Sequence, residues 1–170
     1  MTRIAVVLSV FLLTLGAFAS AEEGGVKKME ITSPEFKNNE MMPERFGYAR
    51  DNVNPELNID GVPAGAQSLV LIVDDPDAPR NTWVHWVLYD IPVIDRIEED
   101  SAPGTQGITD YRQKRYGGPM PPSGTHRYFF KLYALDKKLG LKEGADKKTV
   151  ERAMEGHILD QAELIGLYKK

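Results

Sequence analysis

The chain has 170 residues, with 21 Lys and Arg against 25 Asp and Glu, a net charge of −4 and no cysteine. This length accommodates one well-packed domain and is too short for two domains that each bury a sizeable hydrophobic core. The lack of cysteine excludes disulfides as a source of stability, and the negative charge argues against nucleic acid as a partner.

Residues 1–21 have the pattern of a secretory signal peptide. An arginine at position three is followed by an apolar segment over residues 4–15 and by the small-residue sequence Ala19-Ser20-Ala21. We therefore expect cleavage after Ala21, a single mature domain over residues 22–170, and a periplasmic or secreted location. An uncleaved membrane anchor is the alternative, although the apolar segment is short for a membrane span.

The first clear strand is predicted by the apolar run at residues 68–73, which is typical of a buried strand. This run leads directly into Asp74, Asp75, Pro76 and Asp77. Because a proline restricts the residue before it to extended conformations, we expect Asp75 to be held extended at the strand end, before a stiff loop, as a candidate ligand-binding carboxylate. Asp74 and Asp77 are interpreted as solvated turn residues.

Residues 82–89 predict a second strand that is apolar or aromatic on both faces, as expected in the centre of a sheet. His85 is the one strongly polar residue in the middle of this segment. A lone histidine in such a strand is more often a hydrogen-bonded core residue than a ligand. Both interpretations of His85 stay open at this point.

The region from Asp95 to Gln113 is predicted to be a long loop. It continues into the basic and aromatic stretch at residues 111–116, just before Gly117. This stretch is interpreted either as a rim that attracts anions or as an ordinary solvated loop.

A glycine- and proline-rich segment at residues 117–128 ends in His-Arg-Tyr. Glycines allow backbone N–H groups to approach a ligand, and a period of two places His126 and Tyr128 on the same face of the following strand. An imidazole, a phenol and glycine amides together offer several donors to a phosphate or carboxylate. Turn formation also explains the Gly and Pro residues without any ligand.

The C-terminal region, residues 146–168, predicts one long helix with Asp146 as its N-cap. Apolar residues form a stripe along it, namely Val150, Ala153, Met154, Ile158, Leu164, Ile165 and Tyr168. The stripe is expected to pack against the sheet, with His157 beside it in a structural role. The same stripe could instead bury against a second subunit in a homodimer.

Three separated motifs carry a family resemblance. The sequences DDPDAP at 74–79, WVHW at 83–86 and GGPMPPSGTHRY at 117–128, in this order, resemble the phosphatidylethanolamine-binding protein family, also called Raf kinase inhibitor-like proteins. The bacterial branch is the most similar, and the resemblance extends from about residue 29 to the end of the chain. It implies a mainly β fold, an antiparallel β-sandwich with a C-terminal α-helix.

The resemblance also implies a small pocket for a phosphate-like or carboxylate-like group. Matched by position, the pocket residues are Asp75, His85, Gly118, His126 and Tyr128, with Pro119 shaping the wall. Met120 stands where the bacterial branch often has cysteine, and the segment 45–56 lacks a Cys-Asp-Gly sequence common there. Met120 and the loop from Tyr48 to Asn54 are expected at the mouth of the pocket, which leaves the ligand preference open.

Three classes of function fit these residues, and a binding module is the leading one. In that class Gly118 N–H, His126, Tyr128 and also His85 donate to a small anion, while Asp75 orients a histidine. The resemblance implies a phospholipid head group as one such anion. Some family members inhibit a protein partner, and the target of an exported protein would lie in the periplasm or outside the cell.

The other two classes are a weak hydrolase or phosphatase and a metal site. The hydrolase lacks an obvious nucleophile, because Ser123 is the one hydroxyl close in sequence and it has no G-x-S-x-G elbow. A metal would use Asp75, His85 and His126 as a two-histidine, one-carboxylate set, against which Arg127 stands beside His126. We therefore expect a binding protein without a cofactor or metal and assign no catalytic residue.

Overall fold

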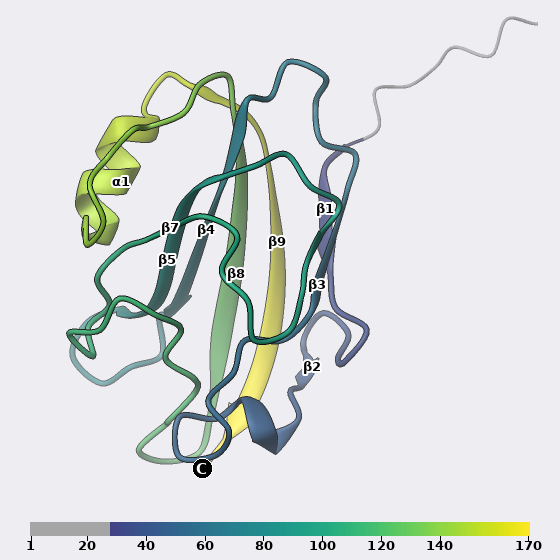
Figure 1. The fold of residues 1–170 in the computed structure, drawn as a ribbon. Coiled ribbons are helices and arrows are strands. Elements are labelled where there is room, and N and C mark those ends of the chain that lie inside the picture. Colours follow the sequence, from purple (N-terminus) through teal and green to yellow (C-terminus); the bar gives the residue numbers. More distant parts are fainter. Residues whose placement is uncertain (1–27) are drawn as a thin grey trace, which may run out of the picture.

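The computed structural model describes residues 28–170 (Figure 1). The predicted signal peptide over residues 1–21, with its cleavage after Ala21, lies outside the described residues. Within the described part the chain forms two β-sheets, one α-helix and a short 3-10 helix. No helix of residues 28–170 has the length and apolar content needed to cross a membrane.

The larger sheet has six strands in the order β2-β9-β8-β4-β5-β7. Its neighbouring strands are antiparallel, except that β2 and β9 are parallel. The strands are β2 (Glu40–Met41), β4 (Ser68–Asp75), β5 (Trp83–Ile91), β7 (Thr105–Gln106), β8 (Thr125–Leu135) and β9 (Ile158–Lys169).

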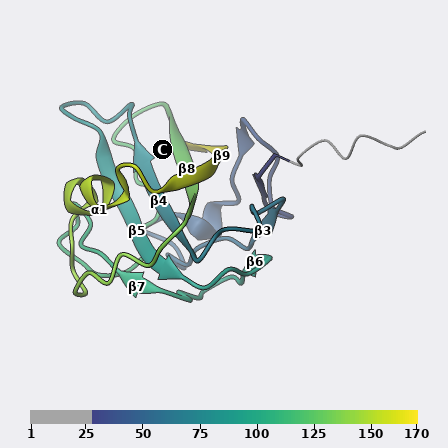
Figure 2. The same cartoon turned by 90° about the horizontal axis from the view of Figure 1, so that it is seen from above.

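The smaller sheet has three antiparallel strands in the order β1-β3-β6. They are β1 (Glu30–Thr32), β3 (Leu57–Asp60) and β6 (Arg96–Ile97), and the helices are the 3-10 helix Glu44–Phe46 and α1 (Lys147–Met154). Figure 2 shows α1 and the smaller sheet on opposite sides of the larger sheet. The predicted mainly β sandwich is confirmed, and β6 and β7 lie within the region predicted as a long loop.

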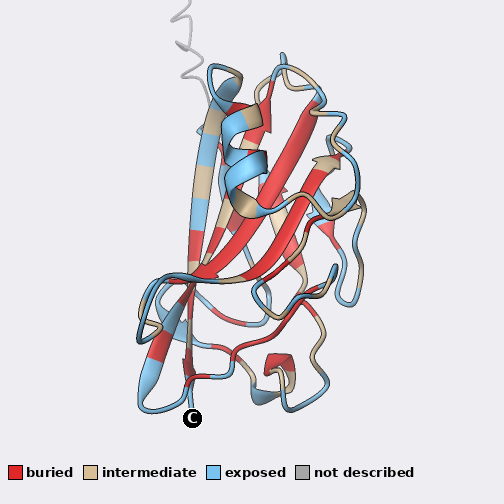
Figure 3. Cartoon of the chain, turned by 90° about the vertical axis from the view of Figure 1, so that its left-hand side faces the viewer, coloured by how far each residue is buried: buried red, intermediate tan, exposed pale blue. Residues whose placement is uncertain are grey.

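The hydrophobic core has two parts because both faces of the larger sheet are covered. One part lies between the two sheets and includes Ile59, Leu71 and Phe130, and the other lies under α1 and includes Ile72 and Val150. All eight residues of β4 are buried, as Figure 3 shows for the central strands. A strand covered on both sides needs apolar residues at every position, which explains the continuous apolar run at its start.

Strand β8 follows the alternation that the sequence predicts. Its buried residues include His126, Tyr128, Phe130, Leu132 and Ala134, while the residues between them are exposed or half-buried. The buried face looks toward the smaller sheet, since Tyr128 and Phe130 belong to the core between the sheets. The predicted pairing of His126 with Tyr128 on one face is therefore confirmed.

The prediction of one helix over residues 146–168 is wrong. Helix α1 ends at Met154, Gly156 has a left-handed φ of 76°, and β9 begins at Ile158. Strand β9 then pairs with β8 along most of its length and buries alternate residues in its second half. This long-range pairing outweighs the local helical pattern. The same apolar residues are compatible with a helix and with a strand, so the local sequence did not distinguish the two.

The beginning of the predicted helix is correct. The Asp146 carboxylate accepts a hydrogen bond of 2.8 Å from the Thr149 backbone N–H, so Asp146 is the N-cap. Val150 and Met154 are buried against the larger sheet of the same chain. His157 lies after the helix, where its Nδ1 is 2.9 Å from Asp136 Oδ1.

Candidate functional site

The candidate site lies where β4 ends and where β5 and β8 begin, at one edge of the larger sheet. Because β4 is antiparallel to both neighbours, these three segments meet although they are far apart in sequence. They bring together Asp75 from β4, His85 from β5, and His126 and Tyr128 from β8. All four residues are buried.

Asp75 and His126 form a buried pair. His126 Nδ1 lies 2.7 Å from Asp75 Oδ2, and the other carboxylate oxygen accepts a hydrogen bond of 2.8 Å from the Asp77 backbone N–H. Because an ionised carboxylate only accepts, Nδ1 carries a proton and donates it to Asp75. Both oxygens of Asp75 are therefore engaged, and the second ring nitrogen of His126 is the one left for a ligand.

Asp74 and Asp77 do not behave as the sequence predicts. Asp74 is fully buried and faces the opposite side of the sheet, where Lys131 Nζ is 2.9 Å and Lys147 Nζ is 2.5 Å from its oxygens. The Asp77 carboxylate is bonded to Arg127 instead of being solvated alone. The side-chain hydrogen bond typical of such a turn is instead accepted by Asp75, from the Asp77 backbone N–H.

His85 lies in the interior with its ring fixed by the loop that follows. Its Nδ1 is 2.6 Å from the Gly117 carbonyl oxygen, and the Gly117 N–H donates to the His85 carbonyl at 2.9 Å. Burial lowers the pKa of His85, and the carbonyl contacts with Gly117 and Gly118 only partly oppose this. The imidazole is therefore neutral at pH 7, with the proton on Nδ1.

The Tyr128 hydroxyl is an unpartnered polar group in the interior. Tyr128 is 1 % exposed, and its hydroxyl has no hydrogen-bond partner among the described residues. Burial raises the pKa of this phenol far above its ordinary value, the Asp75 charge adds to the rise, and the Met120 backbone amide opposes it. Buried hydroxyls are normally paired, so an unpaired hydroxyl at this position is unusual.

Gly118 and Pro119 hold the loop against a second loop rather than leaving a free amide. The Gly118 N–H donates to Asn52 Oδ1 at 2.7 Å, and the Pro119 carbonyl accepts from the Tyr48 N–H at 2.9 Å. A Cβ at position 118 would be 2.1 Å from the Phe46 carbonyl oxygen, so the close backbone approach requires glycine. The donor that the sequence assigned to Gly118 is thus occupied here by Asn52.

An aromatic cluster surrounds His85. Tyr111 stacks on Tyr48 with ring centroids 4.2 Å apart, and its edge contacts with Trp83 and His85 are at 5.5 and 5.6 Å. Tyr128 meets the His85 ring edge-on at 5.0 Å. Asn52 and Tyr111 were not predicted as site residues, and their only sequence signals were the expected mouth loop at Tyr48–Asn54 and the aromatic stretch at 111–116.

The alternatives to binding gain no support from the geometry. Ser123 is exposed and has no hydrogen bond with either histidine of the site. Residues 28–170 contain no group of three His, Cys, Asp or Glu side chains placed to hold a metal ion. Among the described residues, the arrangement presents the polar groups of two histidines and a tyrosine, and no serine or threonine hydroxyl is hydrogen-bonded to either histidine.

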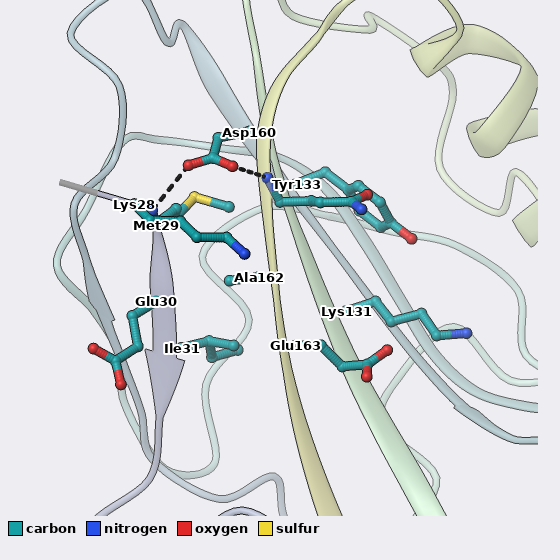
Figure 4. Close-up of a pocket in the computed structure, with 10 residues that line it drawn as sticks. Lys28, Met29, Glu30, Ile31, Lys131, Tyr133, Asp160, Ala162 and Glu163 are labelled. Carbon is teal, nitrogen blue, oxygen red and sulfur yellow. Dashed lines mark hydrogen bonds between the residues drawn. The ribbon is translucent and has the colours of Figure 1, made fainter. Parts of the chain in front are cut away.

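The hollows found among the described residues are not lined by these four side chains. One of about 530 Å³ is lined by residues 78–83, which include Trp83, and by Asp110. Another of about 920 Å³ lies between β1 and β9, as Figure 4 shows, where Asp160 accepts hydrogen bonds from the Met29 and Gln161 N–H groups. None of the six predicted site residues lines this second hollow.

Fold and site together define a β-sandwich protein with a buried polar site at the ends of its central strands. The family model described as phosphatidylethanolamine-binding protein matches residues 32–169. This chain therefore belongs to the phosphatidylethanolamine-binding protein family, as its motifs indicated.

Relatives from archaea and bacteria share much of the sequence. A UPF0098 protein of Methanothermobacter thermautotrophicus is 45 % identical over 150 residues, covering 84 % of this chain and 99 % of that protein. A UPF0098 protein of Aquifex aeolicus is 46 % identical over 152 residues, covering 84 % of this chain and 89 % of the relative.

Solved structures of the family have the same fold. A crystal structure of a phosphatidylethanolamine-binding protein homologue from Chlamydia trachomatis superimposes with a TM-score of 0.81 at 37 % identity, covering 84 % of this chain and 98 % of that one. E. coli YbcL, described as a member of the mammalian family, gives a TM-score of 0.79 at 27 % identity, covering 85 % and 99 % of the two chains.

Proposed function

We propose that this protein binds a small anion, a phosphate or carboxylate group such as that of a phospholipid head group, at the site formed by Asp75, His85, Gly118, Pro119, His126 and Tyr128. The observation that carries the proposal is the buried Tyr128 hydroxyl without a partner. The Tyr128 ring meets the His85 ring edge-on at 5.0 Å, and the Met120 backbone amide opposes the rise in the pKa of the hydroxyl. Such a group gains a strong hydrogen bond when an oxyanion arrives.

Each proposed residue has a separate part in binding. Tyr128 donates its hydroxyl proton to the anion, and His126 donates from the ring nitrogen that Asp75 leaves free. Asp75 fixes the direction of that imidazole, since its Oδ2 accepts from His126 Nδ1 at 2.7 Å. Gly118 and Pro119 shape the wall, because their backbone groups are bonded to Asn52 and Tyr48.

The neutral form of His85 limits the ligands that fit the proposed site. With the proton on Nδ1 donated to Gly117, the other ring nitrogen accepts rather than donates. The sequence-based expectation of a further donor at His85 is therefore replaced by a wall residue with one acceptor. We propose that the protein acts by binding after export, either on a free anion or as a modulator of a protein outside the cytosol.

Titration calorimetry with Tyr128→Phe tests the anion site. The probes are inorganic phosphate, phosphoethanolamine and acetate, added to the full chain and to the chain beginning at Glu22. We expect Tyr128→Phe to weaken phosphate binding by about 10-fold or more, because a charge-assisted hydrogen bond contributes ~1.5–3 kcal/mol. His126→Ala should abolish the heat of binding.

The matched control is Tyr133→Phe, which changes the same residue type on the same strand. Tyr133 lies on the opposite face of β8 and is half-buried. Its variant should bind phosphate as the unmodified protein does. The absence of heat with all three anions, or equal affinities for the Tyr128 and Tyr133 variants, would overturn the proposed function.

A further inference from the structure

Asp77 joins the loop between β4 and β5 to Arg127 of β8. The Asp77 carboxylate accepts three hydrogen bonds from Arg127: from the backbone N–H at 3.0 Å, from Nε at 2.9 Å and from Nη2 at 2.7 Å. The guanidinium lowers the pKa of Asp77 to about 2, so the carboxylate is ionised at neutral pH. A fork of this kind fixes direction as well as distance.

Asp77 also determines how the Asp75 side chain is oriented. The Asp77 backbone N–H donates to Asp75 Oδ1 at 2.8 Å, and Asp75 Oδ2 then faces His126 Nδ1. A carboxylate bonded at one oxygen cannot rotate freely about its Cβ–Cγ bond without breaking that contact. The position of the Asp77 backbone therefore limits the direction in which Asp75 presents its second oxygen.

The two ends of this chain of contacts are adjacent residues on β8. Arg127 is exposed and His126 is buried, so their side chains leave opposite faces of the strand. Asp77 is held from the outer face by Arg127, and Asp75 holds His126 on the inner face. The contacts form a closed circuit: Asp77 bonds to Arg127, the next residue back along the strand is His126, His126 bonds to Asp75, and Asp75 accepts from the Asp77 N–H.

We propose that Asp77 and Arg127 are positioning residues for the anion site, acting through Asp75 on the imidazole of His126. Neither side chain touches the ligand. This inference rests on the proposed function for its effect on affinity, but the geometry of the circuit exists without any ligand. Sites that bind tightly need such supporting contacts, because a small misplacement of a donor removes most of its contribution.

The test compares Asp77→Asn and Arg127→Lys with Glu98→Gln. Glu98 follows β6 and forms a surface ion pair with Arg96 at 2.9 Å, so its variant removes another carboxylate partner of an arginine, a more exposed one, beside the smaller sheet. Phosphate affinity is measured by calorimetry. We expect Asp77→Asn to weaken it about 10-fold, Arg127→Lys to weaken it less because Lys keeps the charge without the fork, and Glu98→Gln to leave it unchanged.

The second readout is the proton NMR signal of His126 Nδ1–H, recorded without any anion. This proton is protected and shifted downfield while it is donated to Asp75, and a His126→Gln variant identifies its signal. We expect the signal to broaden or disappear in Asp77→Asn and to persist in Glu98→Gln. Thermal unfolding of each variant shows that the fold is intact, and Arg127→Lys serves if Asp77→Asn does not fold.

The two readouts separate the failure of this inference from the failure of the proposed function. If the unmodified protein gives no heat with phosphate, phosphoethanolamine or acetate, the anion site is wrong, yet the Nδ1–H signal still decides whether Asp77 positions His126. If the protein binds phosphate and Asp77→Asn changes neither the affinity nor the signal, the positioning role is wrong and the anion site stands.

Discussion

Two consecutive carboxylates at the end of β4 are both buried, but they lie on opposite faces of the sheet and in different surroundings. Asp74 has two lysine ammonium groups around it, from β8 and from α1. Asp75 has one imidazole and one backbone N–H. The charge of Asp74 is thus fully compensated within the fold, whereas the partners of Asp75 include a group that can still bind something else.

The difference separates structure from function at neighbouring positions. A buried charge must be paired, and both oxygens of Asp74 are bonded to lysines. Asp74 therefore links the larger sheet to α1. The Asp75 carboxylate fixes the orientation of the His126 ring, whose second nitrogen remains free. Asp74 and Asp75 are both buried, so burial does not show which of them has a functional role. The chemical type of their hydrogen-bond partners does distinguish them.

The largest expected effect is the loss of stability when Asp74 is removed. Asp74→Ala leaves Lys131 and Lys147 without their common partner and should lower the free energy of unfolding by about 2–3 kcal/mol. Urea denaturation measures this change. The variant should bind phosphate as well as the unmodified protein, because Asp74 lies on the face away from the site.

The matched control for Asp74 is Glu151→Ala, which removes another carboxylate partner of Lys147. Glu151 is half-exposed, with its oxygen 3.6 Å from Lys147 Nζ, so its loss should cost less than about 0.5 kcal/mol. A large effect of Glu151, or a loss of phosphate binding in Asp74→Ala, would break the comparison.

An intermediate effect is expected from Asp75→Asn. The amide keeps the shape and one acceptor oxygen, so the free energy of unfolding should fall by only about 1 kcal/mol. Phosphate binding should weaken at least about 10-fold, because His126 loses the charged partner that fixes its ring. Calorimetry and urea denaturation on the same preparation give both values, and the comparison is wrong if Asp75→Asn costs more stability than Asp74→Ala.

The sequence was sufficient for much of the sheet and for naming Asp75, His85, His126 and Tyr128 as candidates, which the fold brings together. The apolar run of β4 and the alternation in β8 are strong local patterns, and they place His126 and Tyr128 on the same face. The motifs around Asp75 and His85 then carry the resemblance to the family. These features depend on residues close to one another in the chain, which is why they could be predicted.

The rest depends on contacts between distant residues. Lys131 and Lys147 are 57 and 73 residues from Asp74, so no local pattern could replace the solvated turn with a buried ion cluster. Asn52 reaches Gly118 from 66 residues away and has a left-handed φ of 58°. Strand β9 was mistaken for a helix because its pairing with β8, rather than its own propensity, decides its structure.

A pH-dependent effect, similar in size to the stability change expected of Asp75→Asn, concerns Asp77 on the Asp75 side of the comparison. Its pKa falls from 3.8 to about 2 because Arg127 binds the ionised form. A carboxylate whose pKa is lower in the folded state contributes stability above its unfolded pKa, and this contribution is lost as the pH falls from about 4 to about 2. After allowance for solvent screening at this partly exposed pair, the loss should be about 1 kcal/mol.

Urea denaturation at pH 5, 4, 3 and 2, in the unmodified protein and in Asp77→Asn, isolates that contribution. At pH 5 the variant should be less stable by about 1 kcal/mol, and at pH 2 the two curves should lie close together, because about half of Asp77 is then protonated and the neutral carboxyl faces Arg127 as the amide does. A difference that stays constant across this range would mean that the guanidinium does not hold Asp77 through its charge. The loop between β4 and β5 would then be held by packing and uncharged hydrogen bonds, as β4 itself is held by packing.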